Sequence, residues 1–310
     1  MAKVTLWPDI YKEQGHWLPC VSLARSLQNE GYSVEFMGIP DTSVIVQPYG
    51  VRAVGGAGTG PEFHTVLEDI YPFGHSFENK LEPLDQRWKP HHVLPIARGA
   101  LDAVFASATP PDLLISGYFT ALETLIIHRK HGIPFVIMTT FLRHPQDDPA
   151  SRARTQLVYM SDPLRRKLFD LVTGNPDMSI AEFIAPLTEF PELIPCPKEF
   201  DLKDDDWTHG PLTHYVEPMV VRGSLDGGAT TPADPVPELP ENVKLIYATS
   251  GSQVQDYEFR ARQFFINLID MMKTQGGDQY HLIIAAGDKL NSQLRREYNV
   301  GGASNATAPS

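Results

Sequence analysis

The sequence holds little cysteine and no long apolar run. Its two cysteines in 310 residues, Cys20 and Cys196, are too few for a disulfide framework or a cysteine metal site, and we expect both to be reduced and buried. The first residues lack the apolar stretch of a secretory signal, and no run of about 18 apolar residues suits a membrane span. These absences predict a cytoplasmic protein without a transmembrane segment.

Positive charge is also scarce. Lysine and arginine number 26 against 38 aspartates and glutamates, so the formal net charge is −12. Nucleic-acid affinity depends on basic residues that neutralise phosphate, so this balance argues against a nucleic-acid partner. The densest basic runs, 129–131 and 165–167, suit solvated helix faces. The length allows about two domains.

Residues 1–221 alternate strand-like apolar runs with helical patterns, which predicts βαβ units and a parallel sheet. The first expected helix has Pro19 in its first turn and ends near Gly31. Residues 56–92, rich in Gly, Pro and His, suit either long loops over a binding face or a surface insertion. Strands are expected at 3–7, 32–40, 51–55, 111–116 and 133–141, and helices within 121–132, 148–174 and 179–187.

A linker rich in Gly and Pro is expected at 222–242, and a second unit begins at 243. It shows a strand at 243–250, a helix and a strand at 280–286, and residues 299–310 are typical of a disordered tail. A usual domain has ~100–150 residues, so 243–298 is expected to be only part of one. The helix is expected to bury one face, made of Ala261, Phe264, Phe265, Leu268 and Met272.

A histidine lies where the first strand gives way to the first helix, because the segment 13–27 reads "EQGHWLPCVSLARSL" and contains His16. In an open α/β sheet this place is the crevice at the carboxyl ends of the strands, where ligands bind. The imidazole suits a general base because its pKa lies near working pH. The alternative is a helix-terminus histidine satisfied by nearby backbone.

Five segments, in order along residues 3 to about 288, resemble the family 1 glycosyltransferases, the UDP-glycosyltransferase and macrolide-glycosyltransferase group. They read "GHWLPCVSLARSLQNEGYSVEFMG", "PDLLISGYFTALETLIIHRKHGIPFV", "ELIPCPKEFD", "HYVEPMV" and "VKLIYATSGSQV". The resemblance implies the α/β architecture called GT-B, with two Rossmann-like domains facing a cleft. Residues 1–221 would be the complete acceptor-binding domain, and 243–298 the start of the nucleotide-sugar-binding domain.

The resemblance also implies roles for particular residues. His16 matches the general base of an inverting sugar transfer, with a UDP- or dTDP-sugar as co-substrate and neither metal nor cofactor. The small-residue turn after the strand at 243–250 would contact the donor diphosphate, although a plain helix N-cap fits the same letters. The donor residues are Thr249, Ser250, Gly251 and Ser252, and the acceptor residues are Gly15, Trp17 and Tyr118.

Two departures from the family pattern stand out. The aspartate that orients the base is replaced by Gly117, and Asp9, Glu13 or Glu123 are the carboxylates that could substitute for it. The histidine- and glycine-rich donor motif is missing as well, so a transferase for small hydrophobic natural products is expected to be weak or inactive as this chain. The alternative is a non-catalytic acceptor-binding or partner subunit of a split transferase, with another chain supplying the C-terminal half. A lipid-linked sugar transferase or an epimerase ranks last.

Overall fold

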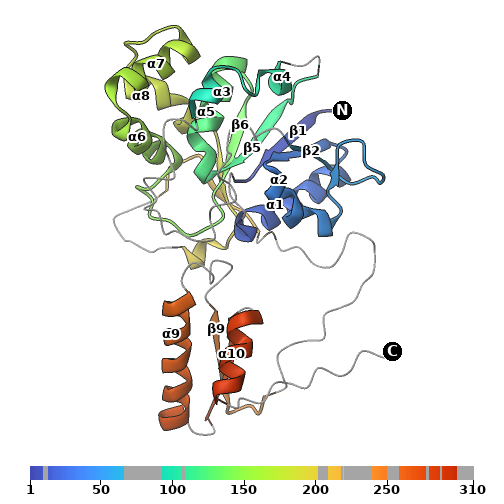
Figure 1. The fold of residues 1–310 in the computed structure, drawn as a ribbon, viewed down its shortest axis with the longest axis vertical. Coiled ribbons are helices and arrows are strands. Elements are labelled where there is room, and N and C mark those ends of the chain that lie inside the picture. Colours follow the sequence, from blue (N-terminus) through green and yellow to red (C-terminus); the bar gives the residue numbers. More distant parts are fainter. Residues whose placement is uncertain are drawn as a thin grey trace. The chain divides into compact units, whose positions relative to one another are not determined.

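The chain divides into two compact units, one of residues 1–77 with 81–230 and one of residues 78–80 with 231–310. The structure, a computed structural model drawn in Figure 1, describes part of each unit. The described residues are 1–9, 13–65, 93–106, 109–201, 209–217, 219, 239–249, 258–276, 279–286 and 288–298.

Unit 1 is built on a parallel sheet whose described strands follow the order β3-β4-β2-β1-β5-β6-β7-β8 (Figure 1). From β1 the chain continues to β2 on one side, and from β5 it continues to β6 on the other. The crevice between β1 and β5 is therefore the topological switch point of the sheet. The strands are β1 (Lys3–Trp7), β2 (Ser33–Gly38), β3 (Arg52–Ala53), β4 (Glu62–Thr65), β5 (Leu113–Gly117), β6 (Phe135–Met138), β7 (Glu192–Ile194) and β8 (Thr213–Tyr215).

Helices cover both faces of this sheet. Leu6 and Trp7 belong to two different core clusters, because successive side chains of a strand point to opposite faces. The Leu6 cluster contains residues of α1 and α2, and the Trp7 cluster contains residues of α3 to α8. The helices are α1 (Gln14–Asn29), α2 (Pro40–Val46), α3 (Val93–Ala97), α4 (Asp102–Phe105), α5 (Ala121–His131), α6 (Pro149–Tyr159), α7 (Asp162–Thr173) and α8 (Ile180–Ile184).

Residues that commonly cap helices stand at several helix ends. Ser179 and Glu182 form a capping box at the start of α8, where the Glu182 N–H donates to the Ser179 hydroxyl over 3.2 Å. The Asp148 carboxylate accepts the Ser151 N–H at the start of α6 over 2.6 Å. Gly174 ends α7 with a φ of 69°, a left-handed conformation that glycine adopts without strain.

The α/β fold with parallel strands is confirmed, and two local expectations are wrong. Pro19 lies inside α1 instead of in its first turn, because the helix already begins at Gln14. The loop expected at 56–92 contains β4, which pairs with β2 and separates it from β3. The rest of that stretch, 66–92, lies outside the described residues.

Unit 2 contains, in its described part, a βαβ unit followed by a helix. Its strands β9 (Lys244–Thr249) and β10 (Tyr280–Ala285) are parallel, with α9 (Glu258–Met271) between them and α10 (Asp288–Tyr298) after them. Ala261 and Phe265 are buried as expected, but Phe264 is 50% exposed and so does not face the core. The sequence analysis missed α10. The expected linker, except 239–242, and the expected tail lie outside the described residues.

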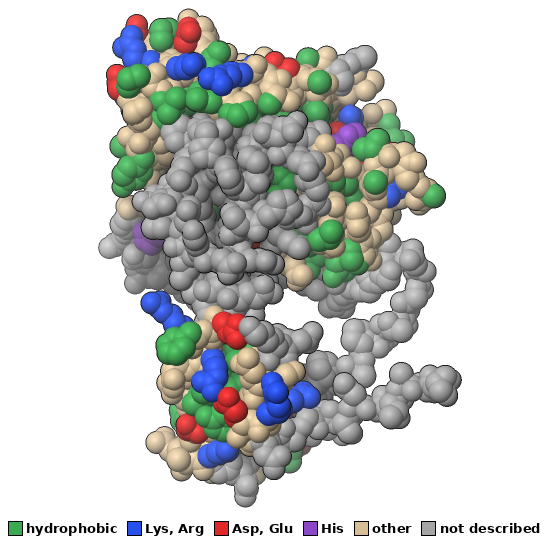
Figure 2. Space-filling view, viewed as in Figure 1, with side chains coloured by type: hydrophobic (Ala, Val, Ile, Leu, Met, Phe, Trp, Pro, Cys, Tyr) green, Lys and Arg blue, Asp and Glu red, His purple; other side chains and the backbone are tan. Residues whose placement is uncertain are grey.

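The two basic runs differ from each other. Figure 2 shows Lys and Arg side chains gathered over α7, where Arg166 pairs with Asp177 over 2.7 Å on an exposed surface. The run 129–131 is not a simple solvated face, because Lys130 and His131 both hold Asp102, at 2.8 and 2.9 Å. These contacts tie α5 to α4.

Both cysteines are free, and Cys20 is buried as expected, whereas Cys196 is only partly buried. Among the residues that the structure describes, no helix combines the length and the apolarity needed to cross a bilayer.

Candidate active site

The candidate site lies at the carboxyl ends of β1 and β5. After β1 the chain passes through Pro8 and Asp9, and His16 then lies in the first turn of α1. The amide of His16 donates to the Glu13 carbonyl over 2.9 Å, which is part of the start of the helix. The parallel pairing of β1 with β5 brings the segment after β5 to the same edge. His16 therefore occupies the switch point that the sequence predicts for it.

A buried carboxylate holds the imidazole. The Nδ1 atom of His16 contacts Oδ2 of Asp9, which is fully buried, and lies 3.6 Å from Oε2 of Glu13. When Nδ1 carries the proton, it donates to Asp9, and Nε2 is left as the basic nitrogen. Such an arrangement fixes the tautomer and the orientation of the ring, as in catalytic His–Asp pairs.

The surroundings of His16 tune its basicity. Burial lowers the pKa of the imidazole, but the negative charge and hydrogen bond of Asp9 and the charge of Glu13 outweigh this effect. The net result is a pKa above the ordinary histidine value. The imidazole is therefore a stronger base than a free histidine, and its protonated form is stabilised where it would arise during proton transfer.

Aromatic side chains from the segments that follow β5 and β6 lie beside the imidazole. The rings of Phe119 and Phe141 lie 5.2 and 6.1 Å from that of His16, and they stack on each other at 5.5 Å. Both rings are partly exposed, so they offer an apolar surface next to the base. The guanidinium of Arg152 lies 4.8 Å from the centre of the Phe119 ring, a cation–π contact that holds this wall in place.

Tyr118 lies behind this wall. Its ring is buried edge-on to Phe119 and Phe141, and its hydroxyl donates to Asp147 over 2.6 Å. Burial and this hydrogen bond raise the pKa of Tyr118, so the phenol remains a proton donor near neutral pH. Tyr118 therefore supports the site instead of competing with His16 as a base.

A buried ion pair anchors the loop that follows β6. The Arg143 guanidinium donates from Nε to Oε1 of Glu192 over 2.9 Å, and it also donates to the carbonyls of His144 and Pro145. The Thr139 hydroxyl donates to the same Glu192 oxygen over 2.6 Å. Because Phe141 lies between Thr139 and Arg143, these bonds hold the chain on both sides of it.

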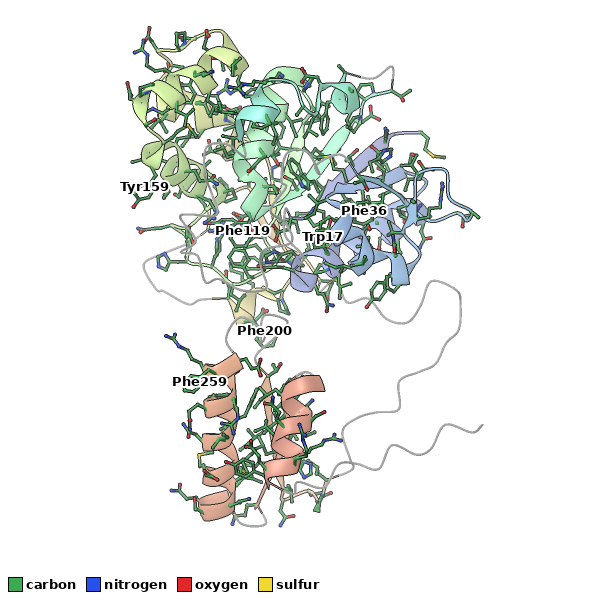
Figure 3. The ribbon with its side chains drawn as sticks, viewed as in Figure 1. Trp17, Phe36, Phe119, Tyr159, Phe200 and Phe259 are labelled. Carbon is green, nitrogen blue, oxygen red and sulfur yellow. The ribbon has the colours of Figure 1, made fainter. Side chains whose placement is uncertain are left out.

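The other residues predicted for the site are found in different places. Gly15 is exposed in the first turn of α1, whereas Trp17 is fully buried and packs on Phe36 and Phe63, as Figure 3 shows for Phe36. Trp17 thus belongs to the core, and we do not propose it for acceptor contact. Thr249 is exposed at the end of β9 in unit 2, and residues 250–252, the rest of the predicted donor turn, lie outside the described residues.

Of the three carboxylates named from the sequence, Asp9 holds His16 and Glu13 lies next to it. The sequence analysis did not find Phe119, Phe141 or Arg152. Their only signal was their place near the ends of two predicted strands or in the first turn of a helix.

The base and the two carboxylates beside it also resemble a metal-binding group. Asp9, Glu13 and His16 are, within the described part of the chain, a set whose ligand atoms all lie within 4.8 Å of one another. The direct bond between His16 and Asp9 accounts for this closeness, and we assign no metal to them.

Comparison with solved structures identifies the fold. The glycosyltransferase of kitacinnamycin matches with a TM-score of 0.56 and 14% identity, over 99% of this chain and 69% of that one. The calicheamicin glycosyltransferase matches with a TM-score of 0.57 and 15% identity, over 93% of this chain and 66% of that one. The chain has the GT-B fold of natural-product glycosyltransferases. The spinosyn rhamnosyltransferase matches with a TM-score of 0.52 and 16% identity, over 100% of this chain and 70% of that one. Its structures include complexes with thymidine diphosphate and with spinosyn aglycone. No protein-family model and no curated protein matches the sequence.

The predicted architecture is thereby confirmed, including a second Rossmann-like domain represented in part. The chain spans 66–70% of the length of these neighbours. The first domain supplies the sheet and the candidate base, and the described part of the second supplies β9 to α10.

Proposed function

We propose that the chain transfers a sugar, with inversion, from a nucleotide-sugar to a hydroxyl group of a small hydrophobic acceptor. The observation that carries the proposal is the contact of His16 with the buried Asp9 at the switch point of the sheet. The partly exposed rings of Phe119 and Phe141 beside it suit an apolar acceptor. The fold shared with natural-product glycosyltransferases supports the same reaction class.

The steps follow from the geometry of the base. The acceptor hydroxyl gives its proton to Nε2 of His16 as its oxygen attacks the anomeric carbon of the sugar. The bond from that carbon to the diphosphate oxygen breaks, and the nucleoside diphosphate leaves with the electron pair. Asp9 stabilises the imidazolium that results, in the way a carboxylate does in other His–Asp pairs. The proposal includes no metal and no cofactor.

We assign the donor to unit 2. The predicted donor segment, 249–252, begins at the last residue of β9. Where a parallel strand gives way to a helix, backbone N–H groups favour phosphate. UDP- and dTDP-sugars both remain candidates, and the thymidine diphosphate complex of the spinosyn rhamnosyltransferase favours testing dTDP first.

The test is a transfer assay with dTDP-glucose and UDP-glucose against a panel of apolar phenols and alcohols, read by mass spectrometry. We expect His16→Ala to lower the rate by about 10²–10⁴-fold, the usual contribution of a general base. His214→Ala, which removes an exposed histidine on β8, is the matched control and should leave the rate unchanged. Equal rates in the wild type and the His16 variant would refute the role of His16.

A second candidate is an acceptor-binding subunit that works with a separate donor-binding chain. The observation that favours it is that the base and its aromatic wall, His16, Phe119 and Phe141, all belong to unit 1. Isothermal calorimetry with dTDP and UDP separates the two functions. Micromolar binding of either nucleotide supports the transferase, whereas acceptor binding without nucleotide binding supports the subunit.

A further inference from the structure

The ends of β1 and β5 approach each other unusually closely at Gly117. A Cβ atom added to Gly117 would overlap the carbonyl oxygen of Pro8 and would lie 2.8 Å from its carbonyl carbon. Both residues are buried. The obstructing atoms belong to the backbone, so no rotation of a side chain can make room. Any other residue at position 117 therefore has to move one of the two strand ends.

Space, and not backbone conformation, makes glycine necessary here. Gly117 has φ −80° and ψ 161°, an extended conformation that every residue adopts without strain. The glycines that end α5 and α7 differ in this respect, because their φ values of 68° and 69° favour glycine by themselves. Gly117 is therefore needed because the absence of a side chain leaves room for the Pro8 carbonyl.

The β5 side of this contact is anchored. The Thr120 hydroxyl donates to the Gly117 carbonyl over 2.9 Å, and the Thr124 hydroxyl donates to Ser116 over 2.7 Å. Both threonines are fully buried. A side chain added at 117 would therefore displace the β1 side, which leads directly to Asp9.

We propose that the contact of Pro8 with Gly117 positions the catalytic base: the missing side chain at 117 admits the end of β1, and this close approach places Asp9 against His16. Proline restricts the backbone at position 8, so the path from the strand into Asp9 has few alternatives. Gly117 and Pro8 are positioning residues, since they act on His16 through Asp9. The catalytic meaning of this inference rests on the proposed function. The geometry of the contact between Pro8 and Gly117 does not depend on that function.

One consequence is that positions 9 and 117 cannot both carry the carboxylate. An aspartate at 117 would need the space of the Pro8 carbonyl, and displacing Pro8 removes Asp9 from the imidazole. The site takes its orienting carboxylate from the β1 side because β5 leaves no room for one.

The experiment is an NMR titration of the His16 ring protons in the wild type, Asp9→Asn, Gly117→Ala and the double variant. Among the residues that the structure describes, the charged groups next to the imidazole are Asp9 and Glu13, and Arg152 lies behind Phe119. Only Asp9 should be displaced by the change at 117. We expect the pKa of His16 to fall by roughly one unit or more in each single variant, because both remove the same carboxylate. The pKa of His16 in the double variant should be no lower than in Asp9→Asn alone.

The matched control is Gly210→Ala, because a Cβ there meets no atom within 4 Å. It should leave the His16 titration unchanged. A folded Gly117→Ala protein with the wild-type pKa of His16 would overturn the inference. If Gly117→Ala does not fold, Pro8→Gly replaces it, since this change adds no atom and frees the chain before Asp9. An unchanged His16 titration in Pro8→Gly would then overturn the inference as well.

This readout uses neither donor nor acceptor. Failure of sugar transfer, with the titration shifts as expected, contradicts only the proposed function. Unchanged titrations, with transfer that depends on His16, contradict only the positioning role of Pro8 and Gly117.

Discussion

His16 and Asp9 are seven residues apart in the sequence, and the packing of α1 beside β1 brings the Nδ1 atom of His16 onto the carboxylate of Asp9. Asp9 is fully buried, while His16 keeps a small exposed fraction. A buried charge is costly unless it is paired, so the imidazole and the carboxylate stabilise each other. The exposed edge of the imidazole is the part that a substrate can reach.

Asp9→Asn should shift the pH dependence of transfer. His16 acts as a base only when it is neutral, and Asp9 raises its pKa, so the acidic limb of the wild-type profile lies above the ordinary histidine value. Asparagine keeps the size of the side chain but not its charge. We expect this limb to move to lower pH while the plateau rate falls by up to about 10⁴-fold. The measurement is the profile of kcat/KM between about pH 5 and 9, a range that covers the histidine titration.

The matched control is Asp170→Asn, which removes an exposed carboxylate on α7. It should leave both the limb and the plateau in place. A limb that stays at the wild-type pH in Asp9→Asn would show that Asp9 does not set the basicity of His16.

Arg143→Met should destabilise unit 1 strongly. Arg143 and Glu192 are both buried, and removal of the cation leaves the Glu192 charge without its main partner. Breaking such a pair costs about 3–5 kcal/mol of unfolding free energy. Urea unfolding followed by circular dichroism measures the loss. Arg166→Met is the control, since its exposed pair with Asp177 contributes about 0–1 kcal/mol. Equal effects in the two variants would contradict the structural role of Arg143.

The parallel sheet and its βαβ units could be predicted from the sequence because apolar runs alternate with helical patterns in residues 1–221. The strand order was not predicted, and elements with weak patterns were missed. β4 has only four residues, "EFHT", inside a stretch rich in Gly and Pro, and α10 buries Leu290 and Leu294 among mostly polar neighbours. A short polar strand forms because β2 and β3 pair with it, which no local pattern reveals.

The site was harder to predict than the fold. The sequence indicates His16, but it leaves Asp9, Glu13 and Glu123 as equal candidates for the orienting carboxylate. The choice depends on the approach of β1 to β5 at Gly117, a tertiary contact between residues 109 positions apart in sequence, counted from Pro8. Trp17 was predicted to contact the acceptor, but its side chain is fully buried. Successive residues on a helix point about 100° apart, so the neighbour of a site residue faces the core.

Glu35→Gln should make unit 1 less stable at neutral pH and less sensitive to acid. Burial raises the pKa of Glu35, but hydrogen bonds from His64, Thr5 and Lys3 outweigh the effect of burial and hold the pKa at about 2. A carboxyl whose folded pKa is lowered contributes stability above its unfolded pKa. That contribution is lost as the pH falls from the unfolded value of 4.5 to about 2. At pH 7 we expect a loss of about 1–3 kcal/mol, the range for hydrogen bonds to a charged group.

Urea midpoints at pH 7 and pH 3 measure both effects. The difference between the two pH values should shrink in Glu35→Gln relative to the wild type. Glu189→Gln, which changes an exposed glutamate in the same unit, should leave that difference unchanged. An unaltered pH difference in the Glu35 variant would contradict the assignment of acid sensitivity to this residue.

Phe141→Ala should weaken acceptor binding more than it slows the chemical step. The Phe141 ring is partly exposed, lies 6.1 Å from the His16 ring and stacks on Phe119, so an apolar acceptor that reaches the base would bury it. Burial of an aromatic side chain contributes about 1.5–3 kcal/mol, which corresponds to a rise of roughly tenfold or more in the acceptor KM. Because Asp9 still holds His16, kcat should change much less. Phe200→Ala is the control, since that ring is 71% exposed in the short helical turn after β7. A fall in kcat with an unchanged KM would instead assign Phe141 to the orientation of His16, and the acceptor would have to bind against another surface of unit 1.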